Sequence, residues 1–237
     1  MTPTPDKAAY VRRMFDAIVA RYDLMNRLMT AGRDEAWRRR AAREAHAPSE
    51  ARLLDVAAGT ADLTLALARQ YPTARIYALD FSLGMLERGI AKVRERGAGE
   101  RVRFIAGDAL ALPFADSSFD AVTSGFLMRN VTDIVRAFAE MRRVVRPGGR
   151  VVCLEISKPV LPLFSRLFWW YFTRVVPAMG RLVSGNAEAY RYLPQSLAQF
   201  VTAEELKGMM EQAGLEEVTY RRLMLGTVAI HVGKRPG

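Results

Sequence analysis

Short β-rich runs alternate with helical stretches between Arg52 and Ser157, and this alternation limits the possible folds more than any other feature. Parallel strands need a long crossover connection, which is usually a helix. The alternation therefore predicts a parallel sheet with helices on both faces, and ligands of such sheets bind at the carboxyl ends of the strands. We expect strands over 52–57, 74–80, 101–109, 119–126 and 150–157, and helices over 62–70, 83–96 and 132–145.

Helical patterns also flank this region. Residues 7–46 are typical of two or three helices broken around 30–32, and the aromatic stretch 158–200 interrupts the alternation as an insertion. A chain of 237 residues suits a single domain with a well-filled core. We therefore expect one domain over 1–237, with residues 1–50 as a helical lid and 158–200 as a helical insertion.

The C-terminal region completes the predicted sheet. Thr202 and Glu205 form a capping box, so a helix is expected to begin there and to end at Gly214. Residues 216–235 predict two strands that turn around Gly226. Five parallel strands closed by a terminal β-hairpin resemble the class I fold of S-adenosylmethionine (SAM) dependent methyltransferases, a Rossmann-like α/β fold with a seven-stranded sheet.

The net charge of +10 favours an acidic partner, such as anionic lipid or nucleic acid. The densest part lies between Arg12 and Arg43, where nine arginines accompany four acids. The remaining positive charge is dispersed along the chain. The basic region is therefore either a solvated helical face or a membrane-binding surface, and nucleic-acid binding is less favoured. One cysteine and two histidines favour neither a disulfide framework nor a metal site. Without a signal-peptide pattern in the first fifteen residues, we expect a cytoplasmic location.

The stretch LLDVAAGTADLTLALA, Leu53–Ala68, has the frame of a glycine-rich nucleotide loop but contains only Gly59. Dinucleotide folds need their glycines so that the backbone can approach a pyrophosphate. SAM has no phosphate, so small residues such as Ala57 and Gly59 suffice, and Thr60 and backbone amides can bind its polar groups. A tight strand–helix turn without a ligand is the alternative reading of this loop.

Three acids follow successive predicted strands. Asp55 can offset the positive charge of SAM, Asp80 can accept both ribose hydroxyls, and Asp108 can accept from the adenine amino group. Each acid separately is compatible with a helix cap or a turn. Together they predict a cofactor that contains a nucleoside.

Four neighbours complete the predicted cofactor site. Phe81 and Met85 are spaced to hold an adenine between them, and Ala109 offers a backbone amide. Ser124 is expected to end the fourth strand and to point into the same crevice.

Two motifs resemble the menaquinone and ubiquinone C-methyltransferase family: YDLMNRLMTAGRDEAWR (Tyr22–Arg38) and RVVRPGGRVVCLEIS (Arg143–Ser157). The segments GFLMRNVTD, AYRYLPQSLAQF and AIHVGKRP are also similar, so the resemblance covers about Phe15 to Pro236. The family usually has serine at Thr30, histidine at Asp34, lysine at Arg146 and glycine-leucine at 127–128. The change at Asp34 removes any role of a histidine there, and Leu127 is expected to narrow the pocket mouth.

The resemblance implies SAM-dependent methylation of a ring carbon in a polyprenylated demethylmenaquinol, giving menaquinol. It assigns contact with the reacting quinol to Arg129 and Asn130. The alternative for Arg129 is an ordinary arginine at the start of a helix. Glu155 is expected to be a buried hydrogen-bond acceptor and Cys153 a core residue. The ring pocket is expected to be lined by Tyr22, Asn26, Tyr190 and Tyr192.

The aromatic insertion suits a prenylated substrate. Arg166 and Arg174 leave only seven uncharged residues between them, too few to span a bilayer. Its aromatic residues can form an apolar channel or rest at a membrane interface as a peripheral contact. A homodimer interface or a lid over the core is the alternative. The residues concerned are Phe164, Phe168, Trp169, Trp170 and Phe172.

Four other functions compete with this one. An RNA methyltransferase would explain the charge, but no RNA-binding module or aromatic-proline tetrapeptide is found. A non-catalytic SAM-binding scaffold would not need the acids together with Arg129 and Asn130. A nicotinamide oxidoreductase would need the missing glycines. The ubiquinone-pathway reaction remains an alternative, although GTAD and HVGKRP are closer to the menaquinone branch.

Overall fold

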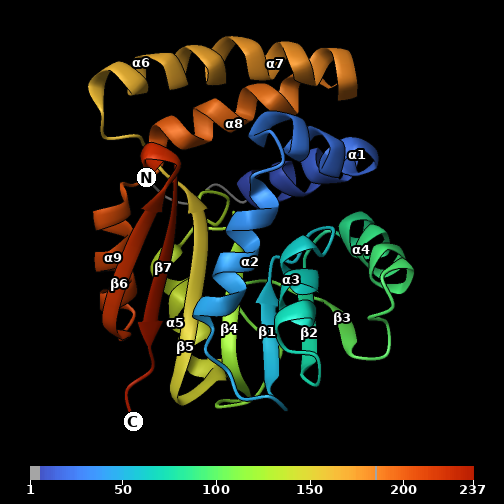
Figure 1. The fold of residues 1–237 in the computed structure, drawn as a ribbon, viewed down its shortest axis with the longest axis vertical. Helices are drawn as coiled ribbons and strands as arrows, with labels where there is room; N and C mark the ends of the chain where they lie inside the picture. The colour runs from blue at the N-terminus through green and yellow to red at the C-terminus, as the bar shows by residue number, and fades with distance from the viewer. Residues whose placement is uncertain (1–5, 185) are drawn as a thin grey trace.

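The computed structural model describes residues 6–184 and 186–237, and a seven-stranded sheet forms its centre (Figure 1). The strand order is β3-β2-β1-β4-β5-β7-β6; β1 to β5 are parallel, and β7 pairs antiparallel with β5 and β6. This confirms the predicted sheet and its terminal hairpin. The strands are β1 (Arg52–Val56), β2 (Arg75–Asp80), β3 (Val102–Ala106), β4 (Phe119–Gly125), β5 (Val145–Ile156), β6 (Glu216–Leu223) and β7 (Val228–Lys234).

Helices cover both faces of the sheet. The buried residues of α2, α3 and α4 form one apolar cluster with one face, and those of α5 and α9 form a second cluster with the other. A parallel strand is therefore buried on both sides, which explains why β1 reads as a nearly continuous apolar run. The covering helices are α2 (Asp34–Glu44), α3 (Asp62–Gln70), α4 (Leu83–Glu95), α5 (Ile134–Val144) and α9 (Ala203–Gln212).

A further helical layer lies over the carboxyl ends of the parallel strands, at the top of Figure 1. It combines the N-terminal helix with the aromatic insertion, although about 130 residues of chain separate them. Tyr171 of the insertion donates a hydrogen bond to the Met29 carbonyl, 3.0 Å away, which joins the two parts. The layer contains α1 (Asp6–Thr30), α6 (Pro162–Trp170), the π-helical η1 (Tyr171–Val175), α7 (Val176–Met179), the π-helical η2 (Gly180–Ser184) and α8 (Ala187–Gln199).

Local signals place most element ends close to their predicted positions, but β5 begins at Val145 and not at the predicted Arg150. The capping box of Thr202 and Glu205 is present at α9, and Gly214 follows this helix with a φ of 84°. The third strand is shorter than predicted: it ends at Ala106, so Asp108 lies two residues beyond it. Cys153 is fully buried in the core, as predicted.

Candidate functional site

Two cavities lie side by side at the carboxyl ends of the strands. The first, here called the strand-end cavity, is bordered by the sheet edge and by α1; the second, the insertion cavity, lies between the end of α1, α2 and the aromatic insertion and has a volume of about 410 Å³. Tyr22 and Phe126 line both cavities. These two side chains therefore mark the border at which the two cavities meet.

Asp80 organises the floor of the strand-end cavity. Its carboxylate accepts hydrogen bonds from the Gly59 amide at 2.8 Å and the Ser82 amide at 2.9 Å, which joins the β1–α3 loop to the end of β2. Burial raises the pKa of Asp80, and the backbone hydrogen bonds act in the opposite direction. The arrangement presents a carboxylate at the position where nucleoside-binding α/β folds bind ribose hydroxyls.

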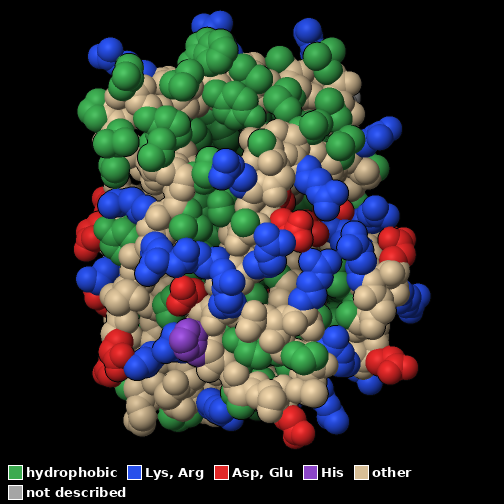
Figure 2. Space-filling view, viewed as in Figure 1, with side chains coloured by type: hydrophobic (Ala, Val, Ile, Leu, Met, Phe, Trp, Pro, Cys, Tyr) green, Lys and Arg blue, Asp and Glu red, His purple; other side chains and the backbone are tan. Residues whose placement is uncertain are grey.

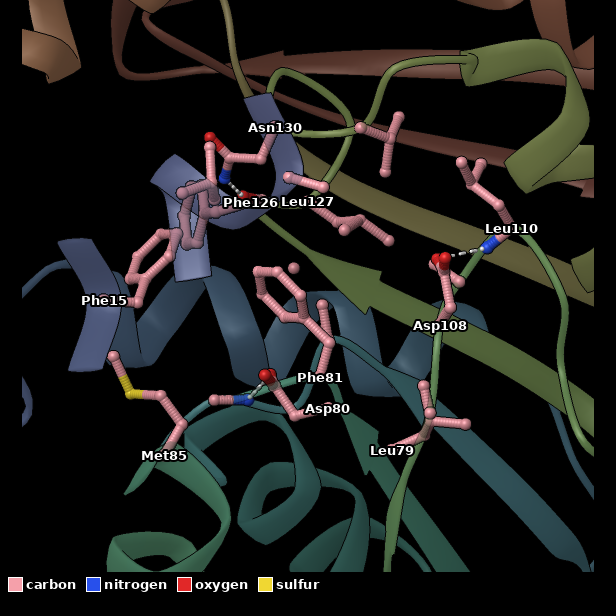
Figure 3. A pocket seen from close by; sticks show the side chains of 18 of the residues that line it. Phe15, Leu79, Asp80, Phe81, Met85, Asp108, Leu110, Phe126, Leu127 and Asn130 are labelled. Atoms are coloured by element: carbon pink, nitrogen blue, oxygen red, sulfur yellow. Dashed lines mark hydrogen bonds between the residues drawn. The ribbon is translucent and has the colours of Figure 1, made fainter. Parts of the chain in front are cut away.

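Asp108, Phe81, Met85 and Ala109, four residues predicted for the cofactor site, also line this cavity. Asp108 is exposed, and its Oδ1 accepts from the Leu110 amide at 2.9 Å. Figure 3 shows Asp80, Phe81 and Asp108 side by side at the sheet edge. Carboxylates beside an aromatic ring suit a ligand with hydroxyl, amino and aromatic groups, so the residues present fit the nucleoside part of SAM.

Three other predicted residues lie beneath the strand-end cavity and do not line it. Asp55 is fully buried and accepts from the Thr64 hydroxyl at 2.7 Å and the Thr123 hydroxyl at 3.1 Å. Thr60 is turned away and donates to Asp23 on α1 at 2.5 Å. Ser124 is buried one residue before Gly125, which lines the cavity in its place. Ala57 and Gly59 line it and adopt positive φ values of 59° and 54°.

Asp55 predicts a specific pH dependence of stability. Burial raises its pKa to about 7, although its two threonine hydrogen bonds act in the opposite direction. Between about pH 4 and 7 the folded state holds a proton that the unfolded state has lost, so this group's contribution to stability falls as pH rises, by at most about 1.4 kcal/mol per pH unit. We expect Asp55→Asn to remove that slope, measured by urea unfolding from pH 4 to 8. Glu100→Gln, at an exposed position, is the control; identical slopes for Asp55→Asn and wild type would contradict the assignment.

Arg129 lies at the wall of the insertion cavity and is held by a buried carboxylate. Its Nη1 donates to Glu155 Oε1 at 2.6 Å and to the Phe126 carbonyl at 2.8 Å. Glu155 also accepts from the backbone amides of Met128 and Ile156, which confirms it as a buried acceptor. The Nε of Arg129 is buried and has no hydrogen-bond partner among residues 6–184 and 186–237.

Tyr22 and Asn26 line the insertion cavity from α1, as predicted. Burial raises the pKa of Tyr22, whereas its hydrogen bond with Asn26 and the charges of Arg38 and Arg129 act to lower it. The phenol of Tyr22 therefore stays neutral beside a cationic wall. Its position between the cavities suits a group that contacts two reactants.

Asn130 lines the strand-end cavity. Tyr190 and Tyr192, which were predicted to line the ring pocket, line neither cavity. The Asn130 amide donates to the Phe126 carbonyl at 3.2 Å and accepts from the Tyr192 hydroxyl at 3.3 Å. Tyr192 therefore reaches the site through Asn130. Tyr190 is buried against Gly180, where a Cβ would lie 2.4 Å from its ring, so it packs α8 against η2 within the insertion.

The sequence reasoning missed the contribution of α1 to the strand-end cavity. Ala8, Val11 and Phe15 line it, and Phe15 reaches toward it from α1 in Figure 3. With Ile18 and Tyr22 they form a stripe spaced by three and four residues, the pattern of one helical face. That periodicity was the available signal, but it does not reveal which surface the face covers.

Leu127 and Asp34, two positions where the chain departs from the family pattern, both line a cavity. Leu127 lines the strand-end cavity at the position where the family usually has glycine. Asp34 lines the insertion cavity, pairs with Arg38 and accepts from Thr30 at 2.9 Å. Within the part of the chain that the structure describes, no three His, Cys, Asp or Glu side chains are placed to hold a metal ion.

Comparisons with known proteins find similar sequences over nearly the whole chain. Residues 3–235 match the model of the ubiE/COQ5 methyltransferase family. A demethylmenaquinone methyltransferase of Roseiflexus castenholzii is 49% identical over 236 residues, covering 99% of this chain and 98% of the relative. A ubiquinone/menaquinone biosynthesis C-methyltransferase of Desulfotalea psychrophila is 42% identical and covers 96% and 91%. A solved SAM-dependent methyltransferase of Thermotoga maritima, a possible histamine N-methyltransferase by its description, shares the fold with a TM-score of 0.67, 19% identity and coverage of 94% and 99%.

Proposed function

The chain belongs to the ubiE/COQ5 methyltransferase family, and from this premise we propose that it transfers the methyl group of SAM to a ring carbon of a polyprenylated demethylmenaquinol, giving menaquinol. The observation that carries the proposal is the pair of adjoining cavities that share Tyr22 and Phe126. One cavity offers strand-end carboxylates for a nucleoside, and the other offers an aromatic chamber for a quinol ring and the start of its tail.

The residues of the strand-end cavity would hold SAM, which supplies an electrophilic methyl group. Asp80 would accept from the ribose hydroxyls and Asp108 from the adenine amino group, with Phe81 and Met85 against the adenine. Ala57, Gly59 and Ala109 have small side chains, so their backbone groups can approach the cofactor closely at the same wall. Asp55, Thr60 and Ser124 would support this wall from below.

Arg129 would act on the quinol from the insertion cavity, and Asn130, which lines the strand-end cavity, would face the transferred methyl group. A reduced quinone ring is a weak carbon nucleophile until a phenolic oxygen loses its proton; the negative charge then reaches the neighbouring ring carbon, which can attack the methyl group. The buried guanidinium of Arg129, fixed by Glu155, stabilises such a phenolate because it is already oriented and shielded from water. Tyr22 and Asn26 would hold the ring in line with the methyl group, an effect worth several kcal/mol. The ring proton leaves after methyl transfer.

Methyl transfer from labelled SAM to a short-tailed demethylmenaquinol, kept reduced, tests this function. We expect label on the ring carbon. Parallel reactions contain a demethylated methoxy-benzoquinol, because one relative is described as serving ubiquinone and menaquinone synthesis, and transfer RNA as the acidic alternative. Preferential labelling of the benzoquinol would assign the ubiquinone reaction. Labelling of RNA alone, or tight SAM binding without any transfer, would contradict the quinone function.

An apolar outer face on the insertion supports peripheral membrane contact, which we place at the cytoplasmic leaflet. Leu163 and Leu182 are 81% and 80% exposed, and Trp170 is 59% exposed. Figure 2 shows this face at the top of the molecule, with Lys and Arg side chains at its rim and in a band below it. Apolar side chains beside cations match the order of acyl chains and anionic headgroups in a membrane. In the described residues, no helix is both long and apolar enough to cross a bilayer.

The outer face yields a prediction about lipid binding. We expect the double variant Leu163→Glu/Leu182→Glu to bind anionic vesicles at least about tenfold more weakly. Each of the two leucines that enters the membrane contributes about 1.5–3 kcal/mol to the binding free energy. Vesicle sedimentation measures this loss. Activity on a short-tailed quinol should persist, whereas activity on a long-tailed quinol in vesicles should fall.

Gln212→Glu/Thr219→Glu is the matched control, since it adds the same charge at exposed positions of α9 and β6. A homodimer is the competing explanation of the apolar face. Conversion of a dimer to a monomer by the leucine variant, with unchanged vesicle binding, would show that a second copy covers this face.

A further inference from the structure

A buried lysine below α1 has no part in the chemistry described above. Lys92 of α4 is almost completely buried, and its ammonium group contacts three oxygens: Asp23 Oδ2 at 2.7 Å, Asp62 Oδ1 at 2.7 Å and Thr60 Oγ1 at 3.1 Å. A lysine ammonium has three N–H donors, so each donor has a partner. Lysine is rarely buried to this degree unless it is paired.

We infer that Lys92 is a positioning residue for both cavities, because it fixes the cofactor loop, residues 57–61, to the helix that carries Tyr22. The inference rests on the proposed function for the identity of the ligands, but not for the contacts. Its three partners come from the cofactor loop (Thr60), the first turn of α3 (Asp62) and α1 (Asp23). No other side chain in the described ranges ion-pairs with both Asp23 and Asp62.

Two of the three partners, Thr60 and Asp23, are next to a residue that lines a cavity. Thr60 follows Gly59, which lines the strand-end cavity, and Asp23 follows Tyr22, which lines both. Thr60 and Asp23 are also joined directly, by a hydrogen bond of 2.5 Å. A shift of Lys92 would therefore change the loop and the helix together.

The cofactor loop needs such a constraint. Ala57 and Ala61 have φ values of 59° and 69°, in the left-handed region that residues with a Cβ rarely adopt. α4 approaches the loop closely one turn before Lys92: a Cβ on Gly89 would lie 3.2 Å from the Gly59 carbonyl and 3.3 Å from the Ala61 Cβ. α4 thus supplies both the tight contact and the cation that hold this conformation.

The position of α1 depends on the same cluster. α1 is also tethered by Asp16, which accepts from the Ser82 hydroxyl, and by Lys7, which donates to the Val131 carbonyl at 2.9 Å. These contacts attach its first half. Asp23 lies next to Tyr22, while the Tyr171 hydrogen bond to the Met29 carbonyl holds the end of α1. Lys92 therefore contributes to how the second half of α1 faces the insertion cavity.

The test measures SAM binding and backbone exchange, neither of which requires methyl transfer. We expect Lys92→Met to weaken SAM binding about tenfold by calorimetry and to speed amide hydrogen exchange about tenfold in α1 and the cofactor loop, with exchange in the central strands unchanged. Lys92→Arg should recover most of the affinity. In the methyl-transfer assay, KM for both substrates should rise more than kcat falls.

Two further variants keep the result interpretable. Lys207→Met removes a lysine that pairs with Glu204 and Glu211 on the surface of α9, and should change none of these readouts. Asp23→Asn removes one partner while Lys92 keeps Asp62, so its effect should be smaller than that of Lys92→Met and should overlap with it in the double variant.

Unchanged SAM affinity and α1 exchange in Lys92→Met would overturn the inference. Equal acceleration of exchange throughout the sheet would also overturn it, because that result would assign Lys92 a role in global stability alone. A wild-type protein that binds SAM but methylates no quinol would contradict the proposed function and leave the binding and exchange results for Lys92 intact.

Discussion

Arg129→Ala is expected to lower kcat/KM for the quinol by about 10²–10³ while SAM affinity stays within a few-fold of wild type. The guanidinium is buried, bound to Glu155 at 2.6 Å and placed at the wall of the insertion cavity, so no water can replace its charge without rearrangement. The loss should appear mainly in kcat, because the charge on the quinol oxygen develops on the way to the transition state. Steady-state kinetics with a reduced short-tailed demethylmenaquinol, together with calorimetry of SAM binding, measures both quantities.

Two companion variants separate chemistry from folding. Glu155→Gln keeps an acceptor for only one of the Met128 and Ile156 amides, which donate to different carboxylate oxygens, and it loses the charge that orients Arg129, so an intermediate loss of kcat is expected. Arg146→Ala breaks a different ion pair of an arginine, with Asp120 at the start of β4, and should leave kinetics near wild type. An Arg129→Ala enzyme with kcat within fivefold of wild type would exclude the proposed role in phenolate stabilisation.

Asp80→Asn is expected to raise the Kd for SAM by about 100-fold. The carboxylate would accept two ribose hydroxyls, and hydrogen bonds to a charged group contribute about 1.5–3 kcal/mol each. The same oxygens receive the Gly59 and Ser82 amides, so an amide side chain also loosens the loop against β2. Calorimetry measures the affinity, and SAM should raise the Tm of wild type by mass action but hardly that of the variant.

Asp116→Asn provides the control for Asp80→Asn. Asp116 is an exposed aspartate that pairs with Arg143 outside both cavities. Its replacement should leave SAM binding unchanged. Equal SAM affinities for wild type and Asp80→Asn would remove Asp80 from the cofactor site, whatever the outcome of the quinol assay.

The fold class could be predicted because its signals are local and repeated. Alternating strands and helices, the capping box at Thr202 and the turn at Gly226 each act within a few residues, and their order along the chain leaves few possible topologies. The acids after the strands were found for the same reason: in a parallel sheet, strand ends meet at one edge wherever they lie in the sequence. Family motifs in the chain added the reaction.

Which of these polar residues face a ligand depends on contacts between distant segments. Asp55, Thr60 and Ser124 satisfied the strand-end rule, yet the first two are turned toward Thr64, Thr123 and Asp23 and the third is buried beneath the cavity. A side chain's direction follows from the partners that burial brings to it, and these partners come from other strands and from α1. No period in the sequence encodes such pairings.

The pairing of α1 with the sheet edge and the insertion likewise arises only on folding. The apolar stripe of α1 is visible in the sequence. The surface that it covers is determined by Lys92, Asp23 and the aromatic insertion, which come from three separate parts of the chain. The amino-acid order thus fixed the scaffold and supplied the chemical groups. Long-range packing determined which groups reach the two cavities. A charged group or a hydroxyl is removed from water only where a hydrogen-bond or ion-pair partner compensates the loss of hydration.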